Sequence, residues 1–239
     1  MIIDFHAHVG KDLEGEEHSV EQLLEHMDEA GIDKSVVFPF NCSDSELIRE
    51  SKIILENSKE NDRLIPFMRF NPNTITKEEL EKLLAMGFKG VKLHPNTQSF
   101  MPNDKKMFWI YEMIEKKGLP ILFHSKMMSG ESSNPEHLLD VAEQFPNLKI
   151  IIGHFFGDVF SIIPKVKNYP NVYTETSIYA RTLRIRDIVE KQGFTRVLFG
   201  SDTPYDHPEV ALKKIKYSGL SEENIKKILQ DNALSIFKD

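Results

Sequence analysis

Two histidines near the start of the chain, His6 and His8, have a spacing that suits a metal ion. They follow the first apolar run, and side chains two positions apart on an extended strand point to the same side. Both imidazoles can therefore reach one ion. A His-x-His pair also occurs by chance at protein surfaces, so the pair needs support from elsewhere in the chain.

Three further polar residues follow apolar runs: His124 ends PILFH, His154 ends KIIIGH and Asp202 follows VLFG. A lone histidine at a strand end is most often structural, because functional sites are few per protein. Agreement between several strand ends indicates a shared site. Zinc-like ions accept imidazole nitrogen and carboxylate oxygen, so we predict a metal held by His6, His8, His124 and Asp202. His154 then stays free nearby to stabilise an oxyanion or to move a proton.

The segment GVKLHP places Lys92 and His94 on one face by the same two-residue rule, which makes both candidates for binding substrate. Lys92 allows three interpretations. It is a buried amine paired with Asp4 or another inward carboxylate, an anchor for a substrate carboxylate, or a carbamylated bridge to a second metal ion.

Three more cations, Arg69, Lys126 and Arg181, lie just past expected strands, where they could anchor a substrate carboxylate. Each could equally be a surface charge, since exposed Lys and Arg are the norm. The stretch SKMMSGESSN reads either as a mobile lid or as a plain connection. Four histidines are interpreted as solvated or locally structural: His18, His26, His137 and His207.

The strands and helices that must position these residues alternate along the chain without a break. Short runs rich in Val, Ile and Phe alternate with stretches of helical spacing, which is typical of parallel strands connected by helices. Strands are expected at Ile2–Phe5, Ser35–Phe38, Leu64–Phe70, Gly90–His94, Ile121–His124, Lys149–Gly153, Val172–Glu175 and Val197–Gly200. Helices are expected at Val20–Ala30, Ser45–Lys59, Lys77–Met86, Lys105–Lys117, Pro135–Gln144, Val159–Lys167, Arg184–Lys191, Glu209–Tyr217 and Glu222–Phe237.

Eight strand-helix units in 239 residues fit a closed parallel barrel better than an open doubly wound sheet. No Ser/Gly-rich linker or block of charge marks a domain boundary. We therefore expect an α/β fold with one domain over residues 1–239, a (β/α)8 TIM barrel of the metal-dependent hydrolase type with an extra C-terminal helix. In such a barrel the carboxyl ends of all strands meet at one mouth.

Composition excludes several classes of function. The net charge is −7 and there is no run of Lys or Arg, which argues against nucleic acid as a partner. No segment stays apolar for the ~20 residues that span a bilayer, and the N-terminus does not read as a signal peptide. Cys42 is the only cysteine, so no intrachain disulfide can form. We expect a soluble cytoplasmic protein that acts on a small molecule, and a homodimer stays open.

At this point seven segments resemble a known family: IIDFHAH, GVKLHP, ILFHS, IIGHFFG, NVYTETS, LFGSDTPY and DNALSIF. In this order they resemble the amidohydrolase superfamily, specifically amidohydrolase family 2, which includes aminocarboxymuconate-semialdehyde decarboxylase. The resemblance runs nearly end to end. It implies one divalent ion, usually zinc, on His6, His8, His124 and Asp202, with His154 as catalytic acid or base. A second ion is the lesser alternative.

Two reactions fit these residues. As a hydrolase of an amide, a lactone or a related bond, the protein would use an ion that lowers the pKa of bound water from about 15.7 toward about 7. Asp202 would take the proton of that water, and His154 would assist the leaving group. As a decarboxylase of an unsaturated or aromatic acid, it would need a cationic anchor and a proton donor instead. The hydrolase is ranked first.

Two other classes rank lower. A non-catalytic metal-binding barrel is disfavoured because all five chemical residues are present, whereas a degenerate site would be expected to lack one. A TatD-like nuclease would share the His-x-His pair, but the acidic balance and the lack of Glu in GVKLHP argue against it.

Overall fold

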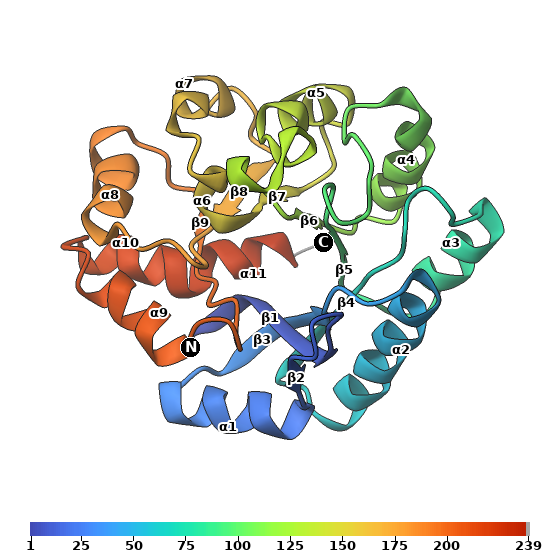
Figure 1. Ribbon diagram of the computed structural model, residues 1–239. Helices are drawn as coiled ribbons and strands as arrows, with labels where there is room; N and C mark the ends of the chain where they lie inside the picture. The colour runs from blue at the N-terminus through green and yellow to red at the C-terminus, as the bar shows by residue number, and fades with distance from the viewer. Residues whose placement is uncertain (238–239) are drawn as a thin grey trace.

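The chain forms a ring of strands surrounded by helices in the computed structural model, which describes residues 1–237 (Figure 1). One nine-stranded sheet runs in the order β2-β1-β3-β4-β5-β6-β7-β8-β9. Every neighbouring pair from β1 onward is parallel, and only β2 is antiparallel to β1. The strands are β1 (Ile3–Lys11), β2 (Glu17–His18), β3 (Lys34–Pro39), β4 (Leu64–Met68), β5 (Gly90–Leu93), β6 (Ile121–Phe123), β7 (Ile150–Ile152), β8 (Val172–Glu175) and β9 (Val197–Leu198).

The ring closes between β1 and the segment at and after β9. The amide of Phe5 donates to the carbonyl of Phe199 at 2.8 Å, and the amide of Asp202 donates to the carbonyl of His6 at 2.9 Å. A parallel bridge between Ala7 and Thr203 continues this seam. The predicted (β/α)8 barrel is therefore confirmed.

Helices follow the strands around the outside of the ring, except that the short element α6 is a buried left-handed turn directly after β7. They are α1 (Val20–Ala30), α2 (Asp44–Glu60), α3 (Lys77–Leu84), α4 (Phe108–Lys116), α5 (Glu136–Gln144), α6 (Gly153–Gly157), α7 (Ile163–Val166), α8 (Thr182–Arg186), α9 (Pro208–Lys216), α10 (Glu222–Lys226) and α11 (Asn232–Ile236). Short 3₁₀ turns lie at η1 (Lys105–Met107), η2 (Met127–Ser129), η3 (Glu131–Ser133) and η4 (Phe160–Ile162), and π turns at η5 (Asp187–Lys191) and η6 (Lys227–Asp231). Since η6 joins α10 to α11, the expected C-terminal helix is present.

Local sequence explains where these helices begin. Before α1, the hydroxyl of Ser19 accepts from the amide of Gln22, and the side chain of Gln22 accepts from the amide of Ser19. This capping box satisfies amides that the first helical turn leaves free. Thr76 and Glu79 repeat the arrangement before α3. Both of these helices bury apolar residues, such as Leu23 of α1.

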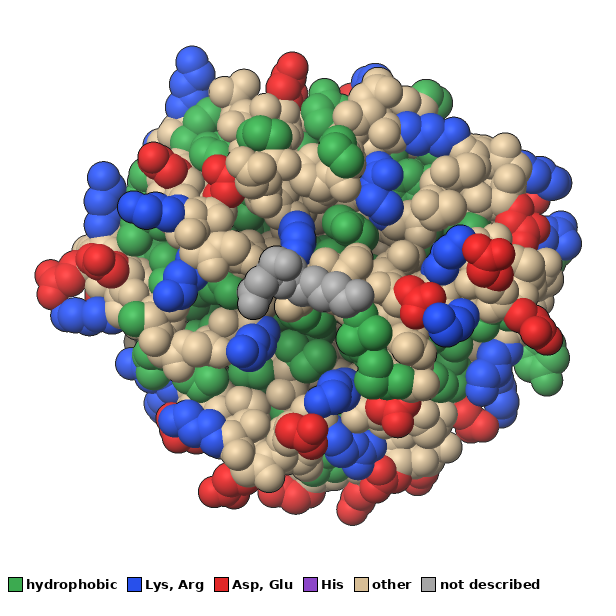
Figure 2. Space-filling model, turned by 180° about the vertical axis from the view of Figure 1, so that it is seen from behind, with side chains coloured by type: hydrophobic (Ala, Val, Ile, Leu, Met, Phe, Trp, Pro, Cys, Tyr) green, Lys and Arg blue, Asp and Glu red, His purple; other side chains and the backbone are tan. Residues whose placement is uncertain are grey.

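Two apolar cores hold the barrel together. One lies between the strands and the outer helices. The other fills the inside of the ring and includes Phe5, Phe38 and Phe67, so the barrel is a packed core rather than a pore. Ile236 of α11 and the stacked ring of Phe237 close this core at the end opposite the mouth. Figure 2, seen from that end, shows hydrophobic side chains gathered near the axis.

Two segments differ from the sequence-based expectation. β1 continues past Phe5 to Lys11, so His6 and His8 are part of the strand rather than following it. After β7, the residues His154, Phe155 and Phe156 have φ of 52°, 50° and 62° and form a left-handed turn. Left-handed residues other than glycine are disfavoured by ~1–2 kcal/mol each, so surrounding contacts must stabilise this turn.

Among residues 1–237, no helix is both long enough and apolar enough to cross a bilayer.

Candidate active site

The first part of the site joins β1 to the loop after β9. Nε2 of His6 lies 2.9 Å from Oδ1 of Asp202, and Nε2 of His8 lies 3.1 Å from the same oxygen. The extended backbone of β1 places both imidazoles on one side, as predicted. Two of the four predicted ligands, His6 and His8, thus meet at one oxygen of a third, Asp202.

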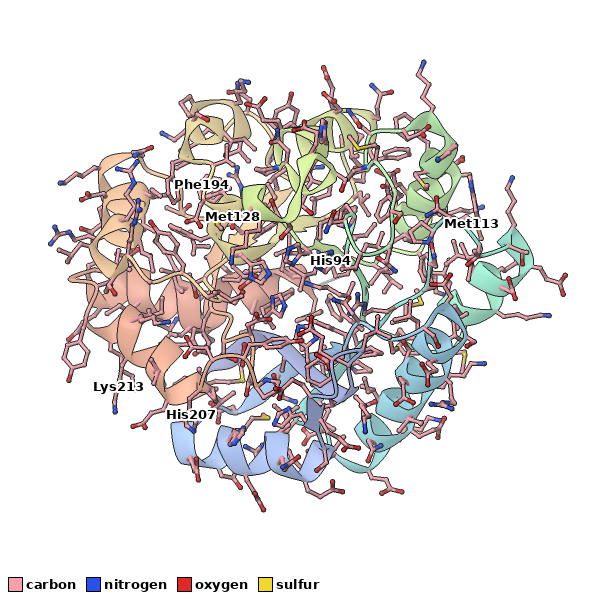
Figure 3. The ribbon with its side chains drawn as sticks, in the orientation of Figure 1. His94, Met113, Met128, Phe194, His207 and Lys213 are labelled. Carbon is pink, nitrogen blue, oxygen red and sulfur yellow. The ribbon has the colours of Figure 1, made fainter. Side chains whose placement is uncertain are left out.

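The second part of the site comes from the ends of β6 and β7. Nδ1 of His124 lies 3.0 Å from Nε2 of His154, and the ring of His124 stacks on His94 at a centroid distance of 3.6 Å. On its other side, Nε2 of His124 lies 3.2 Å from the hydroxyl of Ser129 in η2. Figure 3 shows His94 near the centre of the ring and His207 at its edge.

The two parts together can hold a divalent ion. His6, His154 and Asp202 each offer a ligand atom, and these atoms lie within 4.8 Å of one another. A tetrahedral ion with bonds of ~2.0–2.1 Å needs ligand atoms about 3.4 Å apart, so small side-chain movements would close this group on an ion. His154 is thus placed at the centre itself, beside the ligands that the sequence predicted. Which of His124 and His154 binds the ion and which moves protons stays a prediction.

The charge states of the site also suit a cation. Burial lowers the pKa of His8 to about 3 and that of His154 to about 4, and it holds the pKa of His124 well below the ordinary value, so these imidazoles are neutral at pH 7. Burial alone would raise the pKa of Asp202, but His6 and His8 hold it well below the ordinary value. Neutral imidazoles around one carboxylate form a donor set for zinc or a similar ion.

The pKa of His6 shifts in the opposite direction. Burial and the nearby Lys92 act to lower its pKa, but Asp202 and Glu175 outweigh them and raise it. The two carboxylates therefore favour the protonated form of His6 in the metal-free protein. Because a metal ligand must present a free lone pair, binding at Nε2 would release that proton.

Two basic side chains are buried at neighbouring strands, Lys92 on β5 and Arg69 just after β4. Nζ of Lys92 lies 3.3 Å from Nε2 of His6 and 4.9 Å from the centre of the Phe38 ring. The guanidinium of Arg69 donates to the carbonyl of Pro39 at 2.8 Å and to the side chain of Asn41. Among the described residues, neither cation has a carboxylate within ion-pair distance.

The proposed pairing of Lys92 with Asp4 is not observed. The carboxylate of Asp4 accepts from the amide and hydroxyl of Ser201 at 2.9 Å and 2.6 Å and from the amide of His6 at 3.0 Å. Burial lowers the pKa of Lys92 to about 7, and it lowers that of Arg69 to about 10. Both groups therefore lie in a site poor in solvent.

The other cations predicted to anchor substrate lie farther out. Lys126, which follows β6, is half-buried, and Arg181, which precedes α8, is exposed. Their roles stay predictions. Of the histidines assigned to structure or solvent, His207 caps α9, and His18 is buried with its Nδ1–H donating to the carbonyl of His8 at 2.7 Å.

Aromatic rings form one side of the mouth. Phe40 stacks on His8 at a centroid distance of 5.1 Å, and Tyr205 approaches the same imidazole edge-on at 5.6 Å. The hydroxyl of Tyr205 donates to the carboxylate of Asp12 at 3.2 Å, which links the loops that follow β1 and β9. Of these two rings, that of Tyr205 is exposed and that of Phe40 is buried.

Glu175 and Ser177 are the residues that sequence reasoning missed. Oε1 of Glu175 lies 2.9 Å from Nδ1 of His6, and the hydroxyl of Ser177 lies 2.7 Å from Nδ1 of His154. A usable signal was present, because Glu175 ends β8 just as His124 and His154 follow β6 and β7. The run VYTE is mixed rather than apolar, and so it did not stand out.

Two curated relatives match parts of the sequence. Gamma-resorcylate decarboxylase of Polaromonas sp. strain JS666 is 26% identical over 171 residues, covering 61% of this chain and 49% of that protein. Dihydroorotase of Vibrio campbellii is 25% identical over 165 residues, covering 63% of this chain and 48% of that protein. The chain thus spans about half the length of the curated relatives it matches.

Solved structures share the fold over almost the whole chain. 2,6-Dihydroxybenzoate decarboxylase from Rhizobium has a TM-score of 0.79 at 18% identity and covers 99% of this chain and 98% of its own. A dihydroxybenzoic acid decarboxylase from Polaromonas sp. JS666, solved with bound manganese and 2-nitroresorcinol, has a TM-score of 0.79 at 18% identity, covering 99% and 96%. At such identities the likeness concerns the fold alone.

The family profile described as amidohydrolase matches residues 3–238, which is nearly the whole chain. The match covers every strand of the barrel. This protein belongs to the amidohydrolase family.

Proposed function

We propose that this protein is a metal-dependent decarboxylase of a small aromatic or unsaturated carboxylic acid. The proposal rests on two buried basic side chains, Arg69 and Lys92, that lack a carboxylate partner among the described residues. A bound carboxylate would favour the charged form of Lys92, whose pKa burial lowers to about 7. A buried cation is unfavourable unless it is paired, so a substrate carboxylate would supply the missing partner. This reading reverses the order given by the sequence, which ranked hydrolysis first.

The similar proteins also favour decarboxylation over hydrolysis. The curated relative from Polaromonas and both structural neighbours described above are decarboxylases by name. Zinc was the expected ion, but the manganese bound by one neighbour makes manganese an equal candidate. Held by His6, His8 and Asp202 with His124 or His154, such an ion would polarise oxygens of the bound acid.

Different residues of the chain then bind the substrate and supply the proton. Lys92 binds the negative charge of the substrate and holds the molecule near the centre, while the exposed ring of Tyr205 contacts its flat face. The bond from the substrate carbon to its carboxylate breaks, the electron pair stays on that carbon, a proton is added there and carbon dioxide leaves. We assign that proton to His154.

His154 suits this role because burial lowers its pKa to about 4. Near pH 7 it is neutral, so it first accepts a proton at Nε2, from solvent or from a substrate hydroxyl, and then donates it to carbon. Its Nδ1 is engaged by the hydroxyl of Ser177 at 2.7 Å, which leaves Nε2 as the atom that exchanges protons.

Hydrolysis of a cyclic amide or a related bond is the second candidate. The partial sequence match to dihydroorotases favours it. So does Asp202, whose low pKa leaves an ionised carboxylate next to the ion site, able to take a proton from attacking water.

One assay panel separates the two reactions. The protein loaded with zinc or with manganese is given phenolic carboxylates, lactones and cyclic amides, and released carbon dioxide is measured beside released acid. Carbon dioxide from a phenolic carboxylate supports the proposal. Acid release from the lactones or amides, with no carbon dioxide from any carboxylate, would replace it with the hydrolase.

A matched pair of lysine variants tests whether Lys92 anchors the substrate. Lys92→Met keeps the length of the side chain and removes the charge, and we expect activity to fall by about 30-fold or more, as for loss of a buried ion partner. Lys89→Met alters an exposed lysine just before the same strand and should leave activity within about twofold. Equal activity of the two variants would remove Lys92 as the anchor.

A further inference from the structure

We propose that Glu175, acting with Ser177, fixes which ring nitrogen His6 and His154 present to the metal centre. These two residues would be positioning residues that touch neither substrate nor ion. The inference rests on the proposed metal site, but its first test needs no metal.

The contact with His6 is direct. Oε1 of Glu175 lies 2.9 Å from Nδ1 of His6, and both side chains are fully buried. A carboxylate only accepts hydrogen bonds, so Nδ1 must carry a proton. Nε2 of His6, on the far side of the ring and 2.9 Å from Asp202, is then the nitrogen left for a metal ion.

The link to His154 runs through a hydroxyl. Ser177 lies with its Oγ 2.8 Å from Oε1 of Glu175 and 2.7 Å from Nδ1 of His154. A serine hydroxyl has one proton, and the carboxylate requires it. The same Oγ must therefore accept from Nδ1–H of His154, which leaves Nε2 with a free lone pair toward the centre.

Glu175 also holds the backbone of the left-handed turn. The amide of His154 donates to its Oε1 at 2.8 Å, and the amide of Ser177 donates to its Oε2 at 2.7 Å. The same carboxylate thus sets the ring of His6, the ring of His154 and the backbone from which His154 projects.

The neighbouring strands leave space for this carboxylate. A Cβ added to Gly200 would overlap Oε2 of Glu175, and one added to Gly153 would lie 3.3 Å from Oε1 and 2.8 Å from the carbonyl of Phe123. Gly200 does not have a positive φ, so no backbone strain requires glycine there. Its small size is explained by the carboxylate that it accommodates.

The contacts of Glu175 fit an ionised carboxylate. Each of its two oxygens accepts a hydrogen bond from a backbone amide, and Oε1 also lies against Nδ1 of His6. A fully buried and ionised carboxylate is held here only by donors that belong to the site or adjoin it. Carboxylates that orient metal-bound imidazoles typically account for 10–100-fold in metal affinity.

The first experiment reads the rings in metal-free protein. Long-range ¹H–¹⁵N spectra of the histidines distinguish Nδ1–H from Nε2–H. At alkaline pH, where the His6 ring is neutral, we expect Nδ1–H on both His6 and His154 of the wild type. In Glu175→Gln we expect the His6 signals to change, and in Ser177→Ala those of His154 alone. Unchanged tautomers in both variants would overturn the proposal. If Glu175→Gln does not fold, the Ser177→Ala spectrum decides.

The second experiment measures affinity for zinc by competition with a chromophoric chelator. We expect Glu175→Gln to bind about 10–100-fold more weakly than the wild type. Glu143→Gln, which changes an exposed glutamate on α5, serves as the matched control and should bind normally. Equal affinity of Glu175→Gln and the wild type overturns the proposal. A wild type that binds neither zinc nor manganese would instead defeat the proposed function, and the ring spectra would still test Glu175.

A double-variant cycle isolates the space at Gly200. Gly200→Ala should displace the carboxylate and weaken zinc binding toward the level of Glu175→Gln. With Glu175→Ala already in place, the added methyl meets no carboxylate and should have little further effect. Additive losses in the double variant would show that Gly200 acts independently of Glu175, against the proposal.

Discussion

Oδ1 of Asp202 lies 2.9 Å from Nε2 of His6, although one residue follows β9 and the other lies on β1. The contact spans the seam where the ring of strands closes, because the amide of Asp202 also donates to the carbonyl of His6. The candidate metal centre is therefore built across the seam. Loss of either side chain should affect both the ion and the closure of the barrel.

Asp202→Asn should abolish tight metal binding, because it removes the one anionic ligand of the candidate centre. Elemental analysis of protein purified without chelator should find less than about a tenth of the wild-type metal content, as expected for loss of a first ligand where outer partners already account for 10–100-fold. Asp206→Asn, in the same loop, is the control and should keep its metal. Full metal content in Asp202→Asn would remove the centre as described.

Metal should stabilise the folded protein. An ion that binds only the folded ring adds about 2.7 kcal/mol when its free concentration is 100 times its Kd. We expect zinc or manganese to raise the midpoint of thermal unfolding and a chelator to reverse the effect, as measured by calorimetry. Identical midpoints with and without metal, in protein shown to be metal-free at the start, would contradict this.

Stability of the metal-free protein should fall with acidification below about pH 6.5. Folded His8 and His154, with pKa values lowered to about 3 and about 4, stay neutral where the unfolded chain takes up protons. Their contribution is present above pH 6.5 and is lost, by about 1.4 kcal/mol per pH unit for each histidine, as pH falls toward the folded values. His6 and Asp4 have raised pKa values in the folded protein, so they stabilise the fold as the pH falls.

The pH prediction is checked by urea unfolding at pH 7.5, 6.0 and 5.0 in the presence of a chelator. His207→Gln, at the half-buried histidine that caps α9, is the control for replacing a histidine outside the site and should show the wild-type slope. His8→Phe removes one of the groups responsible and should lessen the slope. A wild type that becomes more stable toward pH 5.0 would show that the raised groups dominate.

Gly157→Ala should destabilise the protein more than Gly193→Ala. Both glycines have positive φ, of 58° and 66°, so alanine strains both backbones to a similar degree. At Gly157 the added Cβ would also lie 2.7 Å from the hydroxyl of Ser125, whereas at Gly193 nothing lies within 4 Å. We expect about 1 kcal/mol for Gly193→Ala and at least about 2 kcal/mol for Gly157→Ala, measured by urea unfolding. Equal losses would show that the turn can shift.

Hydrophobic pattern alone predicted much of this molecule. The eight barrel strands appear where runs of Val, Ile and Phe were found, and Val172–Glu175 has the predicted bounds. Strand ends were less well placed, because β1 carries two polar residues, His6 and His8, that interrupt its apolar pattern. Side chains that point into a polar mouth do not contribute to the signal by which a strand is recognised.

The remaining features depend on tertiary contacts. The left-handed turn at His154 is held by Glu175 and by the hydroxyl of Thr174, which accepts from the amide of Phe156 at 3.0 Å. Neither contact is visible in local sequence. Likewise, Arg69 follows β4 with an ordinary spacing, and only the fold shows it buried beneath the mouth. Sequence could locate such residues, but it could not separate a buried cation from a surface charge.

The seam also has a kinetic consequence. The strand that carries His6 and the segment after β9 that carries Asp202 pair last if the ring grows through its sequential neighbours. Contacts of such wide separation in sequence are slow to form. An ion that needs both residues can then stabilise only the completed ring. We expect metal to slow unfolding while leaving the refolding rate nearly unchanged, so occupancy would lengthen the lifetime of the native barrel rather than assist its formation.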